Sequence, residues 1–347
     1  MNRHYVFLAV FFAVCAMNTA FSGDESWKQQ LQEQEKKLAQ AHTDTITLKP
    51  LLKEGGTERI ERKGVLVWFD DAEATIVMCH GFFCNKYDIS CFRNLFPWGR
   101  FNFLTFDFRA HGEGADGQCS TLGHDEVFDV LAAAEFLKND ERTKEKPIFA
   151  WAFSMGAAAA IGAQAREPVF AGMILDCPYD SCDNVIKTAL DKAKYNFFGY
   201  EFRMPAFVEK YKYHPYVQSF LQAYLKLKIK WDTRNIQLTA KPFNPVELAA
   251  QITVPCFFIY CKNDDKIPAD AVRRIYEAVN GPKDIWETEG RCHFDSYFFN
   301  PEQYAHKVRT FIELVLHNEL EDLQEPVVLE EADMSAEVVT KAEKQII

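Results

Sequence analysis

The stretch Ala152–Gly156, with the sequence AFSMG, constrains the fold of this chain more than any other feature. It follows the apolar run Pro147–Trp151 and precedes four alanines. An apolar strand that turns sharply into a helix at a serine flanked by small residues holds the serine hydroxyl clear of the sheet. Gly156 meets the need for small residues where the two backbones approach closely. The pattern predicts Ser154 as a nucleophile, and the alternative is a simple helix cap.

An acid and a histidine follow later in the chain, each in a loop after a predicted strand. Val254–Tyr260 is typical of a buried strand, and Asp264 lies in the loop that leaves its carboxyl end. After a helical pattern and another short strand, the chain reaches His293. Loops at the carboxyl ends of parallel strands meet at one edge of the sheet, so both residues can approach Ser154. Asp265 is the nearest competitor for the role of the acid.

The order Ser154, Asp264, His293 is the one that α/β-hydrolases use, and it differs from the orders of other serine-enzyme folds. From about Val65 to His317 the chain resembles the α/β-hydrolase superfamily, and within it the serine esterases and acyl hydrolases. The resemblance implies an α/β-hydrolase fold: a mainly parallel central sheet, helices on both faces and a helical lid insertion. It also implies that these three side chains form a catalytic triad.

Other motifs fit the same family. The turn His80–Phe82 has the H-G-x pattern that gives one backbone N–H to the oxyanion hole, which here would be that of Phe82. Met155, which follows the predicted nucleophile, would give the other. The segment Asp107–Gly114 resembles the D-x-R-x-H-G-x-G loop of the family, and Asn244–Val246 resembles its return from the lid.

Two residues depart from the family pattern. Ala152 stands where G-x-S-x-G has its first glycine, and it adds one methyl group to the turn. Cys261 stands where a glycine usually begins the acid loop, so it adds a side chain near the predicted site. We expect the first to affect the geometry of the turn.

The domain organisation follows from the lengths of the connections. Continuous apolar runs such as Ala74–Cys79 indicate strands buried on both faces of a parallel sheet. We assign the hydrolase core to residues 46–178 and 244–317. Residues 179–243 are too many for a simple connection and are rich in aromatic side chains, so we interpret them as the lid.

These features predict a serine hydrolase that acts on a small-molecule carboxylic ester or thioester through an acyl-enzyme. His293 would take the proton of Ser154 during attack and return it to the leaving group, while Asp264 would orient the imidazole. An acyltransferase or peptidase of the same fold is an enzymatic alternative. A hydrolase-fold binding protein without turnover is the alternative outside enzymes.

No cofactor or metal is expected. His80 and His111 fit structural roles in their loops, and His124 opens a helical pattern whose acids suit a helix N-terminus. None of them belongs to a set of metal ligands with typical spacing. Phosphate-binding glycine motifs are absent from the sequence, and no basic aromatic surface indicates binding to nucleic acid.

The amino-terminal end predicts export. Residues 1–22 combine Arg3, an apolar run and a small-residue cleavage pattern, as in a signal peptide. The apolar run is shorter than a spanning helix needs, so no stable membrane span is expected after its removal. The mature protein would be periplasmic or secreted. Membrane anchoring through an uncleaved or lipidated N-terminus is the alternative. Residues 23–45 are rich in Gln, Glu and Lys and predict a polar helical segment.

The cysteines and the carboxyl end complete the sequence picture. Nine of the ten cysteines remain after signal removal. Cys261 and Cys292 flank the acid and histidine loops, so we hypothesise a disulfide between them, with two unpaired thiols as the alternative.

The net charge is −11, and residues 318–347 hold nine acidic side chains against two lysines. This segment therefore predicts a solvated, disordered acidic tail.

Overall fold

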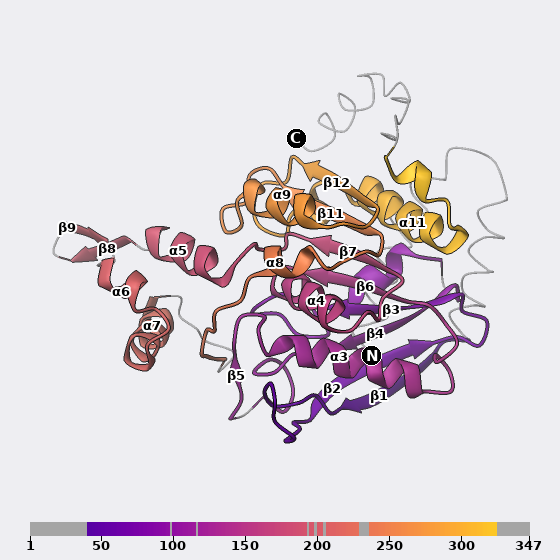
Figure 1. Cartoon of the computed structure of the whole chain (residues 1–347), viewed down its shortest axis with the longest axis horizontal. Helices are drawn as coiled ribbons and strands as arrows, with labels where there is room; N and C mark the ends of the chain where they lie inside the picture. The colour runs from indigo at the N-terminus through magenta and orange to yellow at the C-terminus, as the bar shows by residue number, and fades with distance from the viewer. Residues whose placement is uncertain are drawn as a thin grey trace, which may run out of the picture.

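A mixed sheet of eight strands forms the centre of the molecule. The structure is a computed structural model of the chain, and it describes residues 40–97, 99–115, 117–192, 194–197, 200–203, 206–228 and 236–324. The strands lie in the order β1-β2-β4-β3-β6-β7-β11-β12 (Figure 1). Their bounds are β1 His42–Leu48, β2 Arg62–Trp68, β3 Ala74–Cys79, β4 Phe101–Phe106, β6 Ile148–Phe153, β7 Gly172–Asp176, β11 Cys256–Cys261 and β12 Lys283–Thr288. Within this sheet, only the pairs β1–β2 and β2–β4 are antiparallel.

Helices cover both faces of this sheet because most of its strands are apolar on both sides. Alternate residues of one strand enter different cores: Val77 packs in the cluster that includes α3, α4 and α9, whereas Ile76 packs in the cluster that includes η1 and α11. The elements are η1 Ser90–Leu95, α3 Glu126–Asn139, α4 Met155–Arg166, α8 Pro245–Ala249, α9 Ala269–Ala278, α10 Ser296–Phe299 and α11 Pro301–His317. The mainly parallel sheet covered on both faces is confirmed.

Between β7 and α8 the chain leaves the body of the sheet and projects to one side (Figure 1). It contains α5 Cys182–Lys192, β8 Lys194–Phe197, β9 Tyr200–Arg203, α6 Ala206–Lys210, α7 Pro215–Lys228 and β10 Gln237–Leu238. The insertion is therefore not wholly helical, because β8 and β9 form an antiparallel hairpin. Aromatic and polar residues alternate along both strands, a pattern that favours strand over helix. β10 pairs with β5 (Cys119–Ser120) of the core.

Two predicted boundaries need correction. The polar segment 23–45 ends in a strand, because His42–Thr45 belongs to β1 and pairs with β2. The acidic tail 318–347 begins with ordered residues, since η2 (Leu320–Gln324) packs against the core through the buried Leu323. The apolar spacing of Leu320 and Leu323 gives this turn a hydrophobic side despite its acids.

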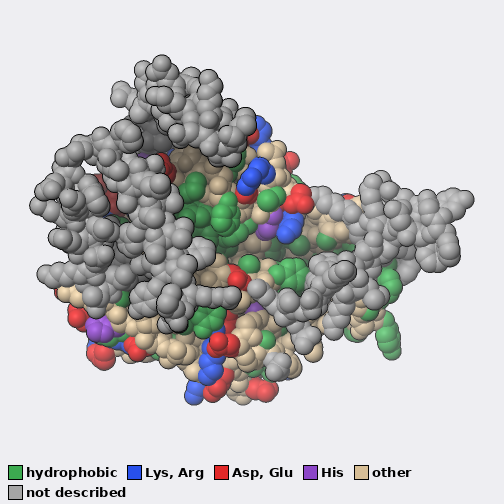
Figure 2. Space-filling model, turned by 180° about the vertical axis from the view of Figure 1, so that it is seen from behind, with side chains coloured by type: hydrophobic (Ala, Val, Ile, Leu, Met, Phe, Trp, Pro, Cys, Tyr) green, Lys and Arg blue, Asp and Glu red, His purple; other side chains and the backbone are tan. Residues whose placement is uncertain are grey.

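The predicted signal peptide, residues 1–22, lies outside the described residues, as do residues 325–347 of the tail. Among the described residues, no helix has both the length and the apolar character that crossing a membrane requires. On the face drawn in Figure 2, basic and acidic side chains of the described residues lie next to one another. Charge on that part of the surface is thus mixed in sign.

Candidate active site

Ser154 lies at the turn between β6 and α4, in the conformation that its motif predicts. Its φ of 51° and ψ of −114° are strained for a residue with a side chain. The backbone N–H of Ser154 donates to the carbonyl oxygen of Asp176 on β7, with an N···O distance of 2.8 Å. The Ser154 side chain makes no capping hydrogen bond. The helix-cap alternative is therefore wrong.

The tight approach at this turn occurs at Gly156. A Cβ atom there would lie 2.4 Å from the carbonyl oxygen of Cys79 and 2.5 Å from that of His80. Both contacts are with backbone atoms, so a side chain could not be accommodated by a rotamer change. Ala152, the departure from the family pattern, is fully buried in the core at the end of β6. The extra methyl group of Ala152 thus packs in the core, and the turn keeps its strained geometry.

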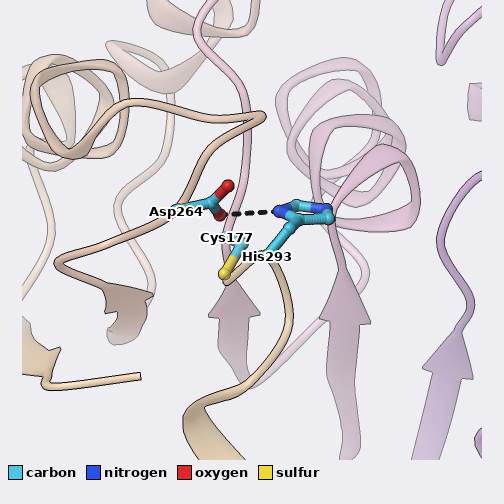
Figure 3. A group of neighbouring side chains, drawn as sticks. All are labelled: Cys177, Asp264 and His293. Carbon is cyan, nitrogen blue, oxygen red and sulfur yellow. Dashed lines mark hydrogen bonds and ion pairs between the residues drawn. The ribbon is translucent and has the colours of Figure 1, made fainter. Parts of the chain in front are cut away.

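The three predicted side chains lie within hydrogen-bonding distance in series. His293 Nε2 is 3.0 Å from the Ser154 Oγ, and His293 Nδ1 is 2.6 Å from Asp264 Oδ2. Figure 3 shows the Asp264 carboxylate facing the imidazole from a separate loop. Asp264 follows β11 and His293 follows β12, two adjacent parallel strands. The carboxyl ends of β6, β11 and β12 therefore bring together residues that are far apart in the sequence.

The environment of Asp264 keeps its carboxyl group ionised. Burial raises the pKa of this group, but the hydrogen bond and charge of His293 outweigh burial, and the net pKa is below the usual value. The backbone N–H groups of Lys266 and Ile267 also donate to Asp264 Oδ1, at 2.8 and 2.9 Å. Asp265, the competitor for this role, is exposed. The structure thus places Asp264, and not Asp265, against the imidazole.

The residues predicted to form the oxyanion hole flank Ser154. Met155 is the first residue of α4, and Phe82 follows β3 in the neighbouring turn. Neither backbone N–H donates to an acceptor among the described residues. Both amides are therefore free to bind an anion, and a helix N-terminus favours negative charge. His80 braces this turn, because its Nδ1 is 2.8 Å from the Gly81 oxygen and its Nε2 accepts from the Phe108 N–H.

His111 also has the structural role expected from the sequence. It is buried, and its Nδ1 lies 2.8 Å from the carbonyl oxygen of Arg109 in the same loop. Burial lowers the pKa of His111 to about 4, so its imidazole is neutral at neutral pH. The neighbouring Arg62 holds this loop by donating to several of its carbonyl oxygens, including that of Gly114 at 2.8 Å.

A cavity of about 380 Å³ opens onto the triad. This volume lies within the range of small-molecule pockets, which is roughly 300–1,000 Å³. The insertion provides much of the wall through α5 and β10, and the core provides the remainder. The apolar lining side chains are Phe82, Phe83, Leu122, Met155, Val185, Ile186, Ala189, Leu190, Leu238, Ala240 and Ile267. The sequence assigned no residue to substrate binding, because the fold alone brings these segments together.

Cys177, with Asp264 and His293, forms a group that could hold a metal ion by distance alone. One ligand atom from each residue lies within 4.8 Å of the others, as Figure 3 illustrates. Both ring nitrogens of His293 already face protein partners. The pKa of the Cys177 thiol is raised well above its usual value by a hydrogen bond with Cys261 and by burial. A metal ligand must be a thiolate, so this chemistry favours a hydrogen-bonded triad over a metal site.

A second buried carboxyl group, which the sequence analysis missed, lies beside the triad. Asp176 ends β7 and is 2% exposed. Tyr304 Oη donates to its Oδ2 at 2.7 Å, and Cys177 Sγ donates to its Oδ1 at 3.1 Å. Burial raises the pKa of Asp176 to about 7. The sequence did contain a signal for this group, because Asp176 is the one acid at the end of an otherwise apolar strand.

The raised pKa of Asp176 predicts a pH dependence of stability. Between about pH 4 and 7 the folded protein binds a proton at Asp176 more tightly than the unfolded chain does. The free energy of unfolding therefore falls as the pH rises through this window. Over this pH range we expect the free energy of unfolding of the wild type to fall by about 2–4 kcal/mol relative to that of Asp176→Asn, whose amide does not titrate. Urea unfolding of both proteins at several pH values measures this difference, and parallel curves would contradict it.

Comparison with known proteins identifies the family of this chain. Residues 76–307 match the model of the Alpha/beta hydrolase family. This chain belongs to the Alpha/beta hydrolase family. The protein YqkD of Bacillus subtilis (strain 168) is 28% identical over 255 residues, which cover 72% of this chain and 75% of that protein. A 31.7 kDa Escherichia coli protein encoded in the traX-finO intergenic region is 21% identical over 241 residues, which cover 64% of this chain and 84% of that protein.

Similar solved structures include esterases. The Pyrococcus furiosus esterase Pf2001 aligns with a TM-score of 0.56 and 19% identity, covering 78% of this chain and 92% of the esterase. Est1E from Butyrivibrio proteoclasticus aligns with a TM-score of 0.51 and 12% identity, covering 79% of this chain and 99% of that protein. At such low identity the likeness shows the shared fold. The predicted α/β-hydrolase fold is thereby confirmed.

Proposed function

We propose that this protein is a serine hydrolase that cleaves a carboxylic ester or thioester through a Ser154–His293–Asp264 triad and an acyl-enzyme. The observation that carries the proposal is the continuous hydrogen-bonded series from the Ser154 Oγ through His293 to Asp264. A binding protein would have no need to keep a strained serine aligned with a hydrogen-bonded acid–histidine pair.

In the proposed reaction, Ser154 attacks the carbonyl carbon while His293 Nε2 accepts its proton. The amides of Phe82 and Met155 stabilise the oxyanion, and His293 then returns the proton to the leaving alcohol or thiol. Water hydrolyses the acyl-enzyme by the same steps. Asp264 stabilises the imidazolium and holds the tautomer in which Nδ1 carries a proton.

The apolar cavity supports an apolar acyl or aryl group as the bound part of the substrate, because its lining offers dispersion contacts and few polar partners. We assign the insertion, residues 179–243, as the lid, since α5 and β10 contribute walls of that cavity. Export to a periplasm or the exterior remains the proposal for location, and it rests on residues 1–22.

A fluorophosphonate probe tests the proposal, because it reacts covalently with an activated serine. We expect the folded wild-type protein to be labelled at Ser154 and labelling to be lost in Ser154→Ala and His293→Ala. Peptide mapping identifies the labelled residue. A folded wild-type protein that stays unlabelled would support the binding-protein alternative.

A further inference from the structure

Two buried cysteines occupy the ends of neighbouring strands behind the triad. Cys177 follows β7, Cys261 ends β11, and neither side chain is exposed. In the parallel register Asp176 lies opposite Ile259, and the Cys177 N–H donates to the Ile259 oxygen at 2.8 Å. The two cysteines are therefore one strand apart across the sheet and one residue apart along it, which places their Cα atoms about 6 Å from each other. A disulfide commonly spans this separation.

The backbone of Cys177 departs from the regular strand conformation. Residues offset by one between regular neighbouring strands point to opposite faces of the sheet. Cys177 breaks this alternation, because its φ of 50° lies in the left-handed region that disfavours a side chain. The two side chains also lie close enough to shift each other's pKa. The strained backbone and the thiol contact therefore occur at the same place.

Cys261 lies among groups that stabilise a thiolate. Its Sγ is 3.1 Å from the Ser296 Oγ, which is in turn 3.0 Å from the Thr288 Oγ1. The interaction with Cys177, together with hydrogen bonds from Ser296, Thr288 and the Asp295 backbone, lowers the pKa of Cys261 to about 6 against the opposing effect of burial. These surroundings therefore favour the thiolate of Cys261, which is the reactive form of a cysteine.

The structure does not support the disulfide predicted between Cys261 and Cys292. Both thiols are free, and Cys292 is exposed whereas Cys261 is buried. Gly290 closes the space beside Cys261 on the histidine loop, since a Cβ atom at Gly290 would lie 2.6 Å from the Cys261 Sγ. Cys261 has Ser296 and Cys177 as neighbours instead.

We propose that Cys177 and Cys261 are an oxidation site, and that a hydroperoxide converts them into a disulfide that inhibits hydrolysis. The Cys261 thiolate attacks one oxygen of hydrogen peroxide, which gives a sulfenic acid and releases hydroxide. The Cys177 sulfur then attacks the sulfenic sulfur; the thiol proton and the departing hydroxide leave as water. The hydroxide from the first step takes up the proton that Cys261 lost on ionisation, so that two thiols are oxidised to one disulfide and one peroxide is reduced to two waters. The small oxidant reaches this pair through local openings of the native chain.

The expected inhibition rests on the proposed function, because it acts through the triad. The Cys177 Sγ lies within 4.8 Å of the ligand atoms of Asp264 and His293 (Figure 3). Forming the S–S bond moves this sulfur toward Cys261 and removes the S–H donor of Asp176. Displacements of about 1 Å near a catalytic group can cost up to a hundredfold in rate. We expect about a tenfold loss of ester hydrolysis that dithiothreitol reverses.

The test treats the full-length protein with hydrogen peroxide and analyses it by intact mass and unreduced peptide mapping. We expect a loss of two hydrogens, a cross-linked peptide that joins Cys177 to Cys261, and recovery of both thiols with dithiothreitol. Cys91→Ser removes an exposed cysteine elsewhere and serves as the matched control; it should behave like wild type. A Cys261–Cys292 cross-link, or a folded protein in which Cys177 and Cys261 stay reduced, would overturn the proposal.

The variant Cys177→Ser provides a second test of the proposed oxidation. Without its resolving partner, Cys261 should gain oxygen atoms as sulfinic or sulfonic acid, and dithiothreitol should no longer reverse the change. Cys261→Ser should prevent both products. Mass is independent of turnover, so the cross-link can form even where the proposed hydrolase activity fails. Conversely, fluorophosphonate labelling of the reduced protein reports on Ser154 even where no cross-link forms.

Discussion

Ser154→Ala is expected to lower kcat for hydrolysis of a p-nitrophenyl ester by roughly 10⁴- to 10⁶-fold. Removal of the nucleophile leaves only the oxyanion donors and the binding cavity, which accelerate the attack of water weakly. Substrate should still bind, because the apolar lining is unchanged. Steady-state kinetics of purified wild type and variant measure the effect.

Ser219→Ala is the matched control for this prediction, since it makes the same change at an exposed position on α7. It should leave kcat within about twofold of wild type, as surface substitutions usually have small effects. Both variants should unfold at a similar temperature to wild type. Substantial turnover in folded Ser154→Ala would place the nucleophile elsewhere.

The centre of the sheet was predictable because its strands are largely apolar. Strands buried on both faces need no alternation, and β3, β6, β7 and β11 are each buried at every position. The strand-to-helix turn was predictable for a related reason, since only a residue without a side chain fits at Gly156. Once the strand order of the fold is known, the loops that carry Asp264 and His293 must meet near Ser154.

The insertion was harder to predict, because several of its elements are short. The hairpin β8–β9 is four residues on each side, and such short segments give little periodic signal. The ordered start of the acidic tail depends on the burial of Leu323 against elements distant in sequence. Charge composition alone cannot indicate such tertiary packing.

The interaction of Cys177 with Cys261 shows a different limit of sequence reasoning. Cys261 and Cys292 flank the two site loops, which favoured their pairing. The neighbour of Cys261 is instead Cys177, which follows the adjacent strand β7, and β7 and β11 are adjacent only because the whole sheet forms. Cys177 also has a left-handed backbone, with a φ of 50°. A left-handed φ of this kind can occur at alanine or serine as well, so the residue type does not predict it.

Asp264→Asn is the second substitution with a large expected effect, a loss of about 10³- to 10⁴-fold in kcat. The amide keeps the size of the carboxyl group and can still accept from the N–H groups of Lys266 and Ile267. Its NH₂ group, however, can donate to Nδ1 of His293, which moves the imidazole proton to Nε2. His293 then has no lone pair facing the Ser154 hydroxyl and cannot act as the general base.

Asp265→Asn is the control for this substitution, because it changes the neighbouring acid in the same loop. Asp265 is exposed and makes no hydrogen bond with His293, so kcat should stay within about threefold of wild type. Reversed sensitivities of the two variants would identify Asp265 as the acid and require the loop to rearrange. Equal and small effects would mean that Asp264 has no catalytic role. A large effect confined to Asp264→Asn requires the carboxylate itself, since its volume and the acceptors of its loop are retained.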